Sequence, residues 1–154
     1  MNINGARQMR KQDLLSLFEL KDPFEDFSPL HDSRLWGWNG NRLALQALVN
    51  LTKPKIIIEV GSWMGLSSAN FSLSMKQLGL HESTLICIDT WLGSLEHWIE
   101  PENRSHLELQ NGYPTFYQRF LSNMAKADCA DNLIPLPMPS QIAHRYLSHY
   151  YLGN

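Results

Sequence analysis

Two features that would quickly narrow the possible functions of this protein are missing from its sequence. No apolar run approaches the roughly 20 residues that a membrane-spanning helix needs. No charge of one sign dominates, since 13 Lys and Arg stand against 15 Asp and Glu. A basic surface for nucleic acid or for an anionic membrane is therefore not expected, and we expect neither kind of partner.

Cysteine is also scarce, with only Cys87 and Cys129. Neither belongs to a CxxC motif or a Cys/His cluster, and an apolar run surrounds Cys87, which is typical of a buried free thiol. The N-terminus carries Arg7, Arg10 and Lys11, which we interpret as a basic segment exposed to solvent. It lacks the apolar core of a secretory signal. These observations favour a reduced, cytoplasmic setting.

Length and composition predict one packed domain, because 154 residues with 44% hydrophobic and 18% charged residues can bury a core. Apolar spacing predicts helices over residues 12–20 and 41–51. We therefore divide the chain into an N-terminal helical segment, 1–54, and an α/β domain, 55–154.

The α/β domain begins with a continuous β-branched run at residues 56–60. A run without alternation predicts a strand covered on both faces, as in a parallel sheet. The elements expected next are a helix at 64–78, a strand at 84–89, a partly ordered excursion or lid at 91–112, a helix at 114–127, a strand at 132–136 and a helix at 139–151. This order predicts an α/β, Rossmann-like, doubly wound parallel sheet preceded by N-terminal helices.

The turn after the first strand predicts a ligand site. Gly61 allows a sharp turn and close approach of a ligand, and Gly65 is expected to let the helix start pack against the strand. Exposed amides at a helix start favour a carboxylate-bearing group, and Asp89, ending the next strand, can accept both hydroxyls of a ribose. The alternative is that the glycines only form turns and that Asp89 is a cap or a solvated acid.

The glycine spacing at residues 61–65 also distinguishes between classes of nucleotide ligand. A dinucleotide-binding loop has glycine where this chain has Trp63, and the lysine-containing P-loop motif is absent. An NAD-dependent oxidoreductase is therefore disfavoured. A nucleoside without a pyrophosphate fits better, and S-adenosylmethionine is the common one.

Residues 56–68 and 86–94, with 111–115 and 134–140, resemble the class I S-adenosylmethionine-dependent methyltransferases. The branch they resemble is the small-molecule one, often grouped with cephalosporin hydroxylase-like proteins, and the resemblance spans roughly residues 36–150. It implies methyl transfer to a small polar acceptor, a small-molecule substrate. The alternative is a non-catalytic nucleoside-binding or assembly module of the same fold.

Carried over by position, the resemblance implies a cofactor site but no catalytic residue. Glu59, Gly61 and Gly65 would form the loop around the methionine part of the cofactor. The other implied contacts are Ser62 and Ser67 lining that loop, Asp89 at the ribose, Thr90 and Trp91 bordering the adenine, and Ser140 at the adenine edge.

Similar families continue with a fourth strand and with acidic residues that can hold a divalent metal, but we identify no metal ligands here. We interpret the sequence as the N-terminal half of the fold, ending after the third strand. The edge of residues 55–60 would then lack a partner strand, which predicts either self-association through that edge or marked instability of the chain.

Several aromatic and histidine residues allow two interpretations. His97 and His106 have acidic neighbours but no metal-ligand spacing, which favours solvated loop side chains. Trp36 and Trp38 are expected to anchor the chain on the sheet rather than to stack on a substrate. Trp91 follows the ribose acid, and a functional role and a core role are equally expected for it.

Overall fold

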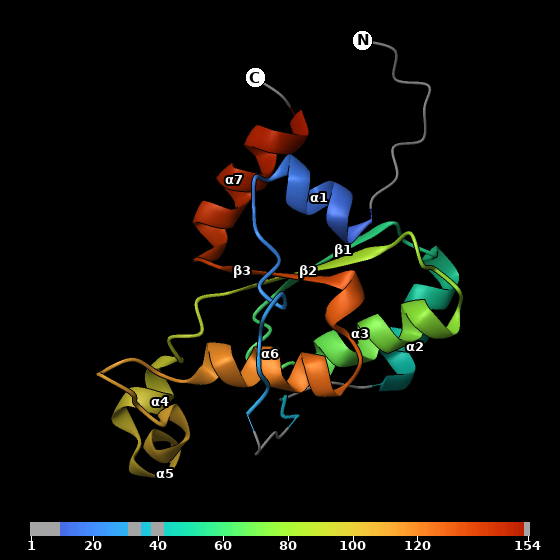
Figure 1. Cartoon of the computed structure of the whole chain (residues 1–154). Helices are drawn as coiled ribbons and strands as arrows, with labels where there is room; N and C mark the ends of the chain where they lie inside the picture. The colour runs from blue at the N-terminus through green and yellow to red at the C-terminus, as the bar shows by residue number, and fades with distance from the viewer. Residues whose placement is uncertain (1–9, 31–34, 38–41, 153–154) are drawn as a thin grey trace.

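A three-stranded parallel sheet lies at the centre of the computed structural model, which describes residues 10–30, 35–37 and 42–152. Its strands, β1 (Ile56–Val60), β2 (Thr84–Asp89) and β3 (Leu133–Pro137), lie in the order β1-β2-β3. Helices α1 (Lys11–Leu17) and α7 (Ser140–Leu152) lie on one face (Figure 1). The other face carries α2 (Arg42–Thr52), α3 (Leu66–Gln77) and α6 (Phe116–Lys126). Parallel strands between two helical layers confirm the α/β class and are consistent with a Rossmann-like fold.

The central strand β2 connects the two halves of the core. Leu85 and Cys87 belong to the cluster on the α3 and α6 side, while Ile86 and Ile88 belong to the cluster on the α1 and α7 side. All four side chains are at most 3% exposed. For β2, the prediction that a continuous apolar run forms a strand covered on both faces is therefore confirmed.

The same expectation is wrong for β1. Ile58 is 54% exposed and Val60 is 63% exposed, although both are β-branched and uncharged. The reason is that β1 lies at the edge of the sheet, while the apolar side chains of α1 and α7 pack in a cluster with those of β2 and β3. One face of β1 and its outer edge are left open.

The excursion after β2 is more regular than expected. It contains α4 (Leu95–Ile99), α5 (Pro101–Arg104) and the 3₁₀ turn η1 (Ser105–Leu107). A capping box between Ser94 and His97 starts α4. The expectation of a solvated His97 is wrong, since this side chain is 5% exposed and packs edge-on against Phe116.

The N-terminal segment also differs from expectation. Lys11 is 3% exposed, forms an ion pair with Asp22 at 2.6 Å and donates to the carbonyl of Ala130 at 2.6 Å. The interpretation of a solvated basic end is therefore wrong for Lys11, while Arg7 lies outside the described residues. The remaining short element is the 3₁₀ turn η2 (Ala130–Asn132). In the described ranges, no helix combines the length and the apolar character that a membrane crossing requires.

Candidate functional site

The loop between β1 and α3, residues 61–65, lies at the carboxyl end of the sheet. Gly61 and Gly65 have φ values of +84° and +91°, and Trp63 between them has a φ of +42°. The amide of Gly61 donates to the carbonyl of Ile88 at 2.8 Å, which fixes the loop against the end of β2. Both glycines therefore occupy the left-handed conformations that their residue type tolerates best. This loop delays the start of α3 to Leu66, two residues later than expected.

The two glycines have different surroundings. A Cβ added at Gly61 would meet no atom within 4 Å. A Cβ added at Gly65 would overlap the terminal methyl group of Met124 and lie 3.2 Å from the ring of Phe120. Gly65 thus makes room for α6, not for the strand as the sequence suggested. Open space beside Gly61 is what close approach of a ligand to the backbone requires.

Glu59 organises the loop from inside the protein. Its carboxylate accepts hydrogen bonds from the hydroxyls of Ser62, at 2.8 Å, and of Ser67 and Ser68. The Cys87 thiol lies 3.6 Å from the same carboxylate, and burial, together with the charge of Glu59, raises the pKa of this thiol well above its usual value. Because Glu59 is only 9% exposed, these donors replace water around its charge. The carboxylate holds the loop in shape.

Asp89 lies where the sequence predicts, at the end of β2 beside the glycine loop. One carboxylate oxygen accepts the amide of Trp63 at 2.8 Å, and the other accepts the amide of Trp91 at 2.8 Å. The side chain is half-buried. Each carboxylate oxygen has a second lone pair, so Asp89 can accept further hydrogen bonds while it holds both backbone amides.

Trp91 is a core residue at this site. Its indole is 2% exposed, lies against Phe120 and Tyr117, and donates from Nε1 to the carbonyl of Trp63 at 2.7 Å. Asn123 of α6 donates to the carbonyl of Met64 at 2.8 Å. The loop is therefore bound to the strands on one side and to α6 on the other. Of the two roles expected for Trp91, the structure shows the packing one.

A small cavity of about 290 Å³ opens beside the loop. It is lined by Trp36, Gly37, Trp63, His97, Asn103 and His106. Trp36 meets the ring of His106 edge-on at 5.2 Å and is 40% exposed, so it lines this cavity instead of anchoring the chain on the sheet. Trp38 lies outside the described residues.

His97 presents one defined tautomer in this cavity. Its Nδ1 accepts the backbone amide of Ser94 at 3.2 Å, so the neutral ring carries its proton on Nε2. Burial, and to a smaller extent the nearby His106, lower the pKa of His97 below its ordinary value. A neutral imidazole of this kind donates a hydrogen bond from Nε2, and its other nitrogen is not available as a general base.

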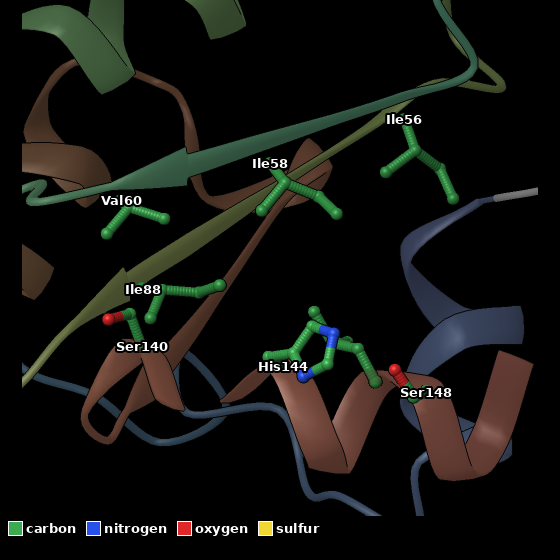
Figure 2. A pocket seen from close by; sticks show the side chains of 8 residues that line it. Ile56, Ile58, Val60, Ile88, Ser140, His144 and Ser148 are labelled. Carbon is green, nitrogen blue, oxygen red and sulfur yellow. The ribbon is translucent and has the colours of Figure 1, made fainter. Parts of the chain in front are cut away.

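One predicted site residue, Ser140, lies apart from this group, while Thr90 stands between Asp89 and Trp91 in the chain. Ser140, at the start of α7, lines a different groove together with side chains of β1 and β2 (Figure 2). Thr90 accepts the amide of Leu92 at 3.3 Å and shapes the turn after β2. The structure thus brings together Glu59, Gly61, Ser62, Gly65, Ser67, Asp89 and Trp91 around the loop.

The contributors to the site that were missed in the sequence include Ser68, His97, Asn103, His106 and Asn123. Ser68 adds a third hydroxyl to Glu59, and the imidazoles of His97 and His106 line the cavity. The position of Ser68, one residue after Ser67 in the first turn of the helix, is a signal that could have indicated its role. The histidines gave no such signal, because their placement depends on the fold of the 91–112 excursion.

The described ranges contain no group of three or more His, Cys, Asp or Glu side chains placed to hold a metal ion. Comparison with known proteins adds no assignment for this site. No protein-family model matches the chain, and no curated protein sequence is significantly similar to it.

Proposed function

We propose that this chain binds S-adenosylmethionine at the carboxyl ends of β1 and β2, as a class I methyltransferase fold does. The observation that carries the proposal is the hydrogen bond from the Trp63 amide to Asp89, which joins the glycine loop and the strand-ending acid into one site. Such a pairing of a glycine-rich turn with an acid on the next strand suits a nucleoside.

The residues present fit this cofactor. The open space beside Gly61 admits a ligand against the backbone, and the half-buried carboxylate of Asp89 has acceptor capacity for ribose hydroxyls. When bound, S-adenosylmethionine supplies a methyl group on a positively charged sulfur. The chain's own part is to hold and orient it, with Glu59 and its serines keeping the loop in shape.

The cavity beside Trp63 supports a small acceptor for the methyl group. Its volume of about 290 Å³ suits a small molecule, and the indoles of Trp36 and Trp63 would cover a flat or apolar part of it. Asn103 and the Nε2 proton of His97 would hydrogen-bond polar groups of the acceptor. These residues position and desolvate an acceptor, and the reaction we propose is methyl transfer to a small polar molecule.

One observation favours a second candidate, a module that binds the nucleoside without turnover. The six residues that line the cavity include no carboxylate, and Nδ1 of His97 is already an acceptor for Ser94. Among these lining residues, His106 is left as the side chain that could act as a general base, and no carboxylate among them orients it. Methyl transfer with product detection separates the two candidates, while binding is common to both.

Calorimetric titration with S-adenosylhomocysteine and with its 2′-deoxy analogue tests the binding proposal. We expect Asp89→Ala to weaken binding of S-adenosylhomocysteine by about 1–3 kcal/mol, or about 5- to 150-fold, because the ribose hydroxyls lose a charged acceptor. The matched control is Asp128→Ala, at a carboxylate that is 92% exposed and pairs with Lys76.

The deoxy analogue separates a binding effect from a folding effect. The wild-type protein should prefer the ligand with the 2′-hydroxyl, and Asp89→Ala should lose that preference even if its fold is weakened. If the wild type binds neither ligand, cofactor binding is refuted. An undiminished preference in Asp89→Ala would remove Asp89 from the ribose site.

A further inference from the structure

Four aromatic rings surround the cavity of about 290 Å³ beside the glycine loop. The ring centroids of Trp36 and Trp63 lie 6.3 Å apart, and the ring of Trp63 lies 5.5 Å from that of His97. The ring of His106 lies 5.2 Å from that of Trp36 and 6.4 Å from that of His97. Each ring therefore neighbours the next around the cavity. A flat ligand can pack on more of these rings at once than a compact aliphatic one can.

Three of these rings are held by the main elements of the fold. The carbonyl of Trp36 accepts the amide of Leu66, at the start of α3, at 3.3 Å. Phe116 of α6 packs edge-on against Trp63, with ring centroids 6.0 Å apart, and against His97, with centroids 5.1 Å apart. The cavity is therefore formed without a ligand, and binding there does not require these rings to be ordered.

His97 offers the cavity a hydrogen-bond donor. Its Nδ1 accepts the amide of Ser94 at 3.2 Å, so the neutral ring carries its proton on Nε2. Burial lowers the pKa of His97, which favours this neutral form. Nε2 has no hydrogen-bond partner among the described residues, yet it is not one of the fully buried nitrogen atoms that lack a partner. A ligand in the cavity can therefore reach the Nε2–H group.

Asn103 offers the cavity a hydrogen-bond acceptor. Its Nδ2 donates to the carboxylate of Glu100. An ionised carboxylate only accepts hydrogen bonds, so the nitrogen of the carboxamide, and not its oxygen, faces Glu100. In the part of the chain that the structure describes, the Oδ1 atom of Asn103 has no partner and is not buried. This oxygen can accept an N–H group of a ligand.

The charge of the lining restricts the ligand further. None of the six lining residues is Lys, Arg, Asp or Glu. An anionic ligand would therefore have no counter-charge in the cavity, and a cationic ligand would meet the positive N–H edge of His97. Moving an unpaired charge out of water into such a cavity is unfavourable. A neutral ligand that accepts from His97 and donates to Asn103 avoids this cost.

We propose that the cavity binds a flat, neutral heteroaromatic molecule that carries a carbonyl and an N–H group, such as a lactam fused to an aromatic ring. The carbonyl accepts from Nε2 of His97, the N–H group donates to Oδ1 of Asn103, and the ring packs on the exposed indole of Trp36. The role of this molecule as the methyl acceptor rests on the proposed function, whereas its binding in the cavity does not depend on the cofactor.

Calorimetric titration of the 154-residue chain with four bicyclic probes tests the proposal. Carbostyril is a lactam fused to a benzene ring, and N-methylcarbostyril lacks its N–H group. N-methylquinolinium is a cation of similar shape, and naphthoate is an anion. We expect carbostyril to bind best, about 5-fold or more tighter than N-methylcarbostyril, because the latter leaves Oδ1 of Asn103 without a donor. Absence of carbostyril binding, or equal or tighter binding of any other probe, would overturn the proposal.

A substitution at Asn103 locates the bound probe. Asn103→Leu should abolish the preference for carbostyril over N-methylcarbostyril, and this ratio is informative even if the variant is less stable. The matched control is Asn50→Leu, at an exposed residue of α2 that lines a separate pocket with α3, and it should keep the preference. An undiminished preference in Asn103→Leu overturns the proposed binding mode.

Titration of the wild type with S-adenosylhomocysteine separates this inference from the proposed function. If carbostyril binds with the expected preference and S-adenosylhomocysteine does not bind, the ligand class of the cavity is supported and its role as a methyl-acceptor site is refuted. If S-adenosylhomocysteine binds and carbostyril does not, the cofactor site is supported and the ligand class proposed here is refuted.

Discussion

Alanine at the two glycines of the loop should affect two different properties of the protein. Both positions have a positive φ, so each substitution is expected to destabilise the fold by about 1 kcal/mol from backbone strain. At Gly61 we expect no further destabilisation, because a Cβ there meets no atom within 4 Å. At Gly65 the Cβ overlaps the end of Met124 and presses on Phe120, and overpacking of this kind adds about 1–3 kcal/mol.

Urea unfolding measures this difference. Gly65→Ala should lower the free energy of unfolding by about 2–4 kcal/mol and Gly61→Ala by about 1 kcal/mol. Met124→Leu, which lacks the terminal methyl group, should recover part of the loss when combined with Gly65→Ala. Equal losses at the two glycines, or strict additivity of Gly65→Ala with Met124→Leu, would refute the packing argument. Calorimetry should show the opposite ranking, with Gly61→Ala weakening S-adenosylhomocysteine binding more than Gly65→Ala does.

Three further predictions concern the residues that hold the loop. Glu59→Ala should destabilise the protein by about 3 kcal/mol in urea unfolding, because it leaves three buried or half-buried hydroxyls without their acceptor, while Glu59→Gln should cost less. Trp91→Phe should cost about 2 kcal/mol by the same measurement, since it removes the bond to the Trp63 carbonyl but keeps a ring in the core. Because the pKa of His97 is lowered in the fold, the unfolded chain binds its proton more tightly, and the wild type should lose stability relative to His97→Gln as the pH falls below about 6.5. Parallel pH dependences of these two proteins would contradict the assignment of His97.

The sheet could be predicted from the sequence because its signals are local. Runs of mainly apolar residues at 84–89 and 133–136 predict buried strands. The glycines at 61 and 65 predict the turn between β1 and α3. The positions of the loop and of Asp89 follow from the ends of β1 and β2 in the same way. The hydrogen bonds from Ser62, Ser67 and Ser68 to Glu59 were not predicted.

The residues that were predicted wrongly depend on tertiary contacts. A β-branched run specifies a strand, but the burial of Ile58 depends on which helices lie above it, and α1 and α7 do not cover it. His97 has acidic neighbours in the sequence, yet the packing of its ring on Phe116 decides its burial. Lys11 is buried because Asp22 and a carbonyl of η2 surround its ammonium group. Such contacts between distant segments leave no periodic pattern in the sequence.

The proposed binding of S-adenosylmethionine would need little ordering of the loop. The Trp63 amide, the Trp63 carbonyl and the Gly61 amide are all hydrogen-bonded within the protein, so the loop is formed before any ligand arrives. Binding does not have to break these bonds, because each oxygen of Asp89 keeps a lone pair for a hydroxyl. A preformed loop avoids the loss of conformational entropy that a flexible loop would suffer on binding. For the same reason, substitutions at Glu59 and Trp91 should lower the stability of the fold more than they change ligand affinity. The Cα of Gly61 faces open space, so a substitution there should change ligand affinity with the smallest effect on stability.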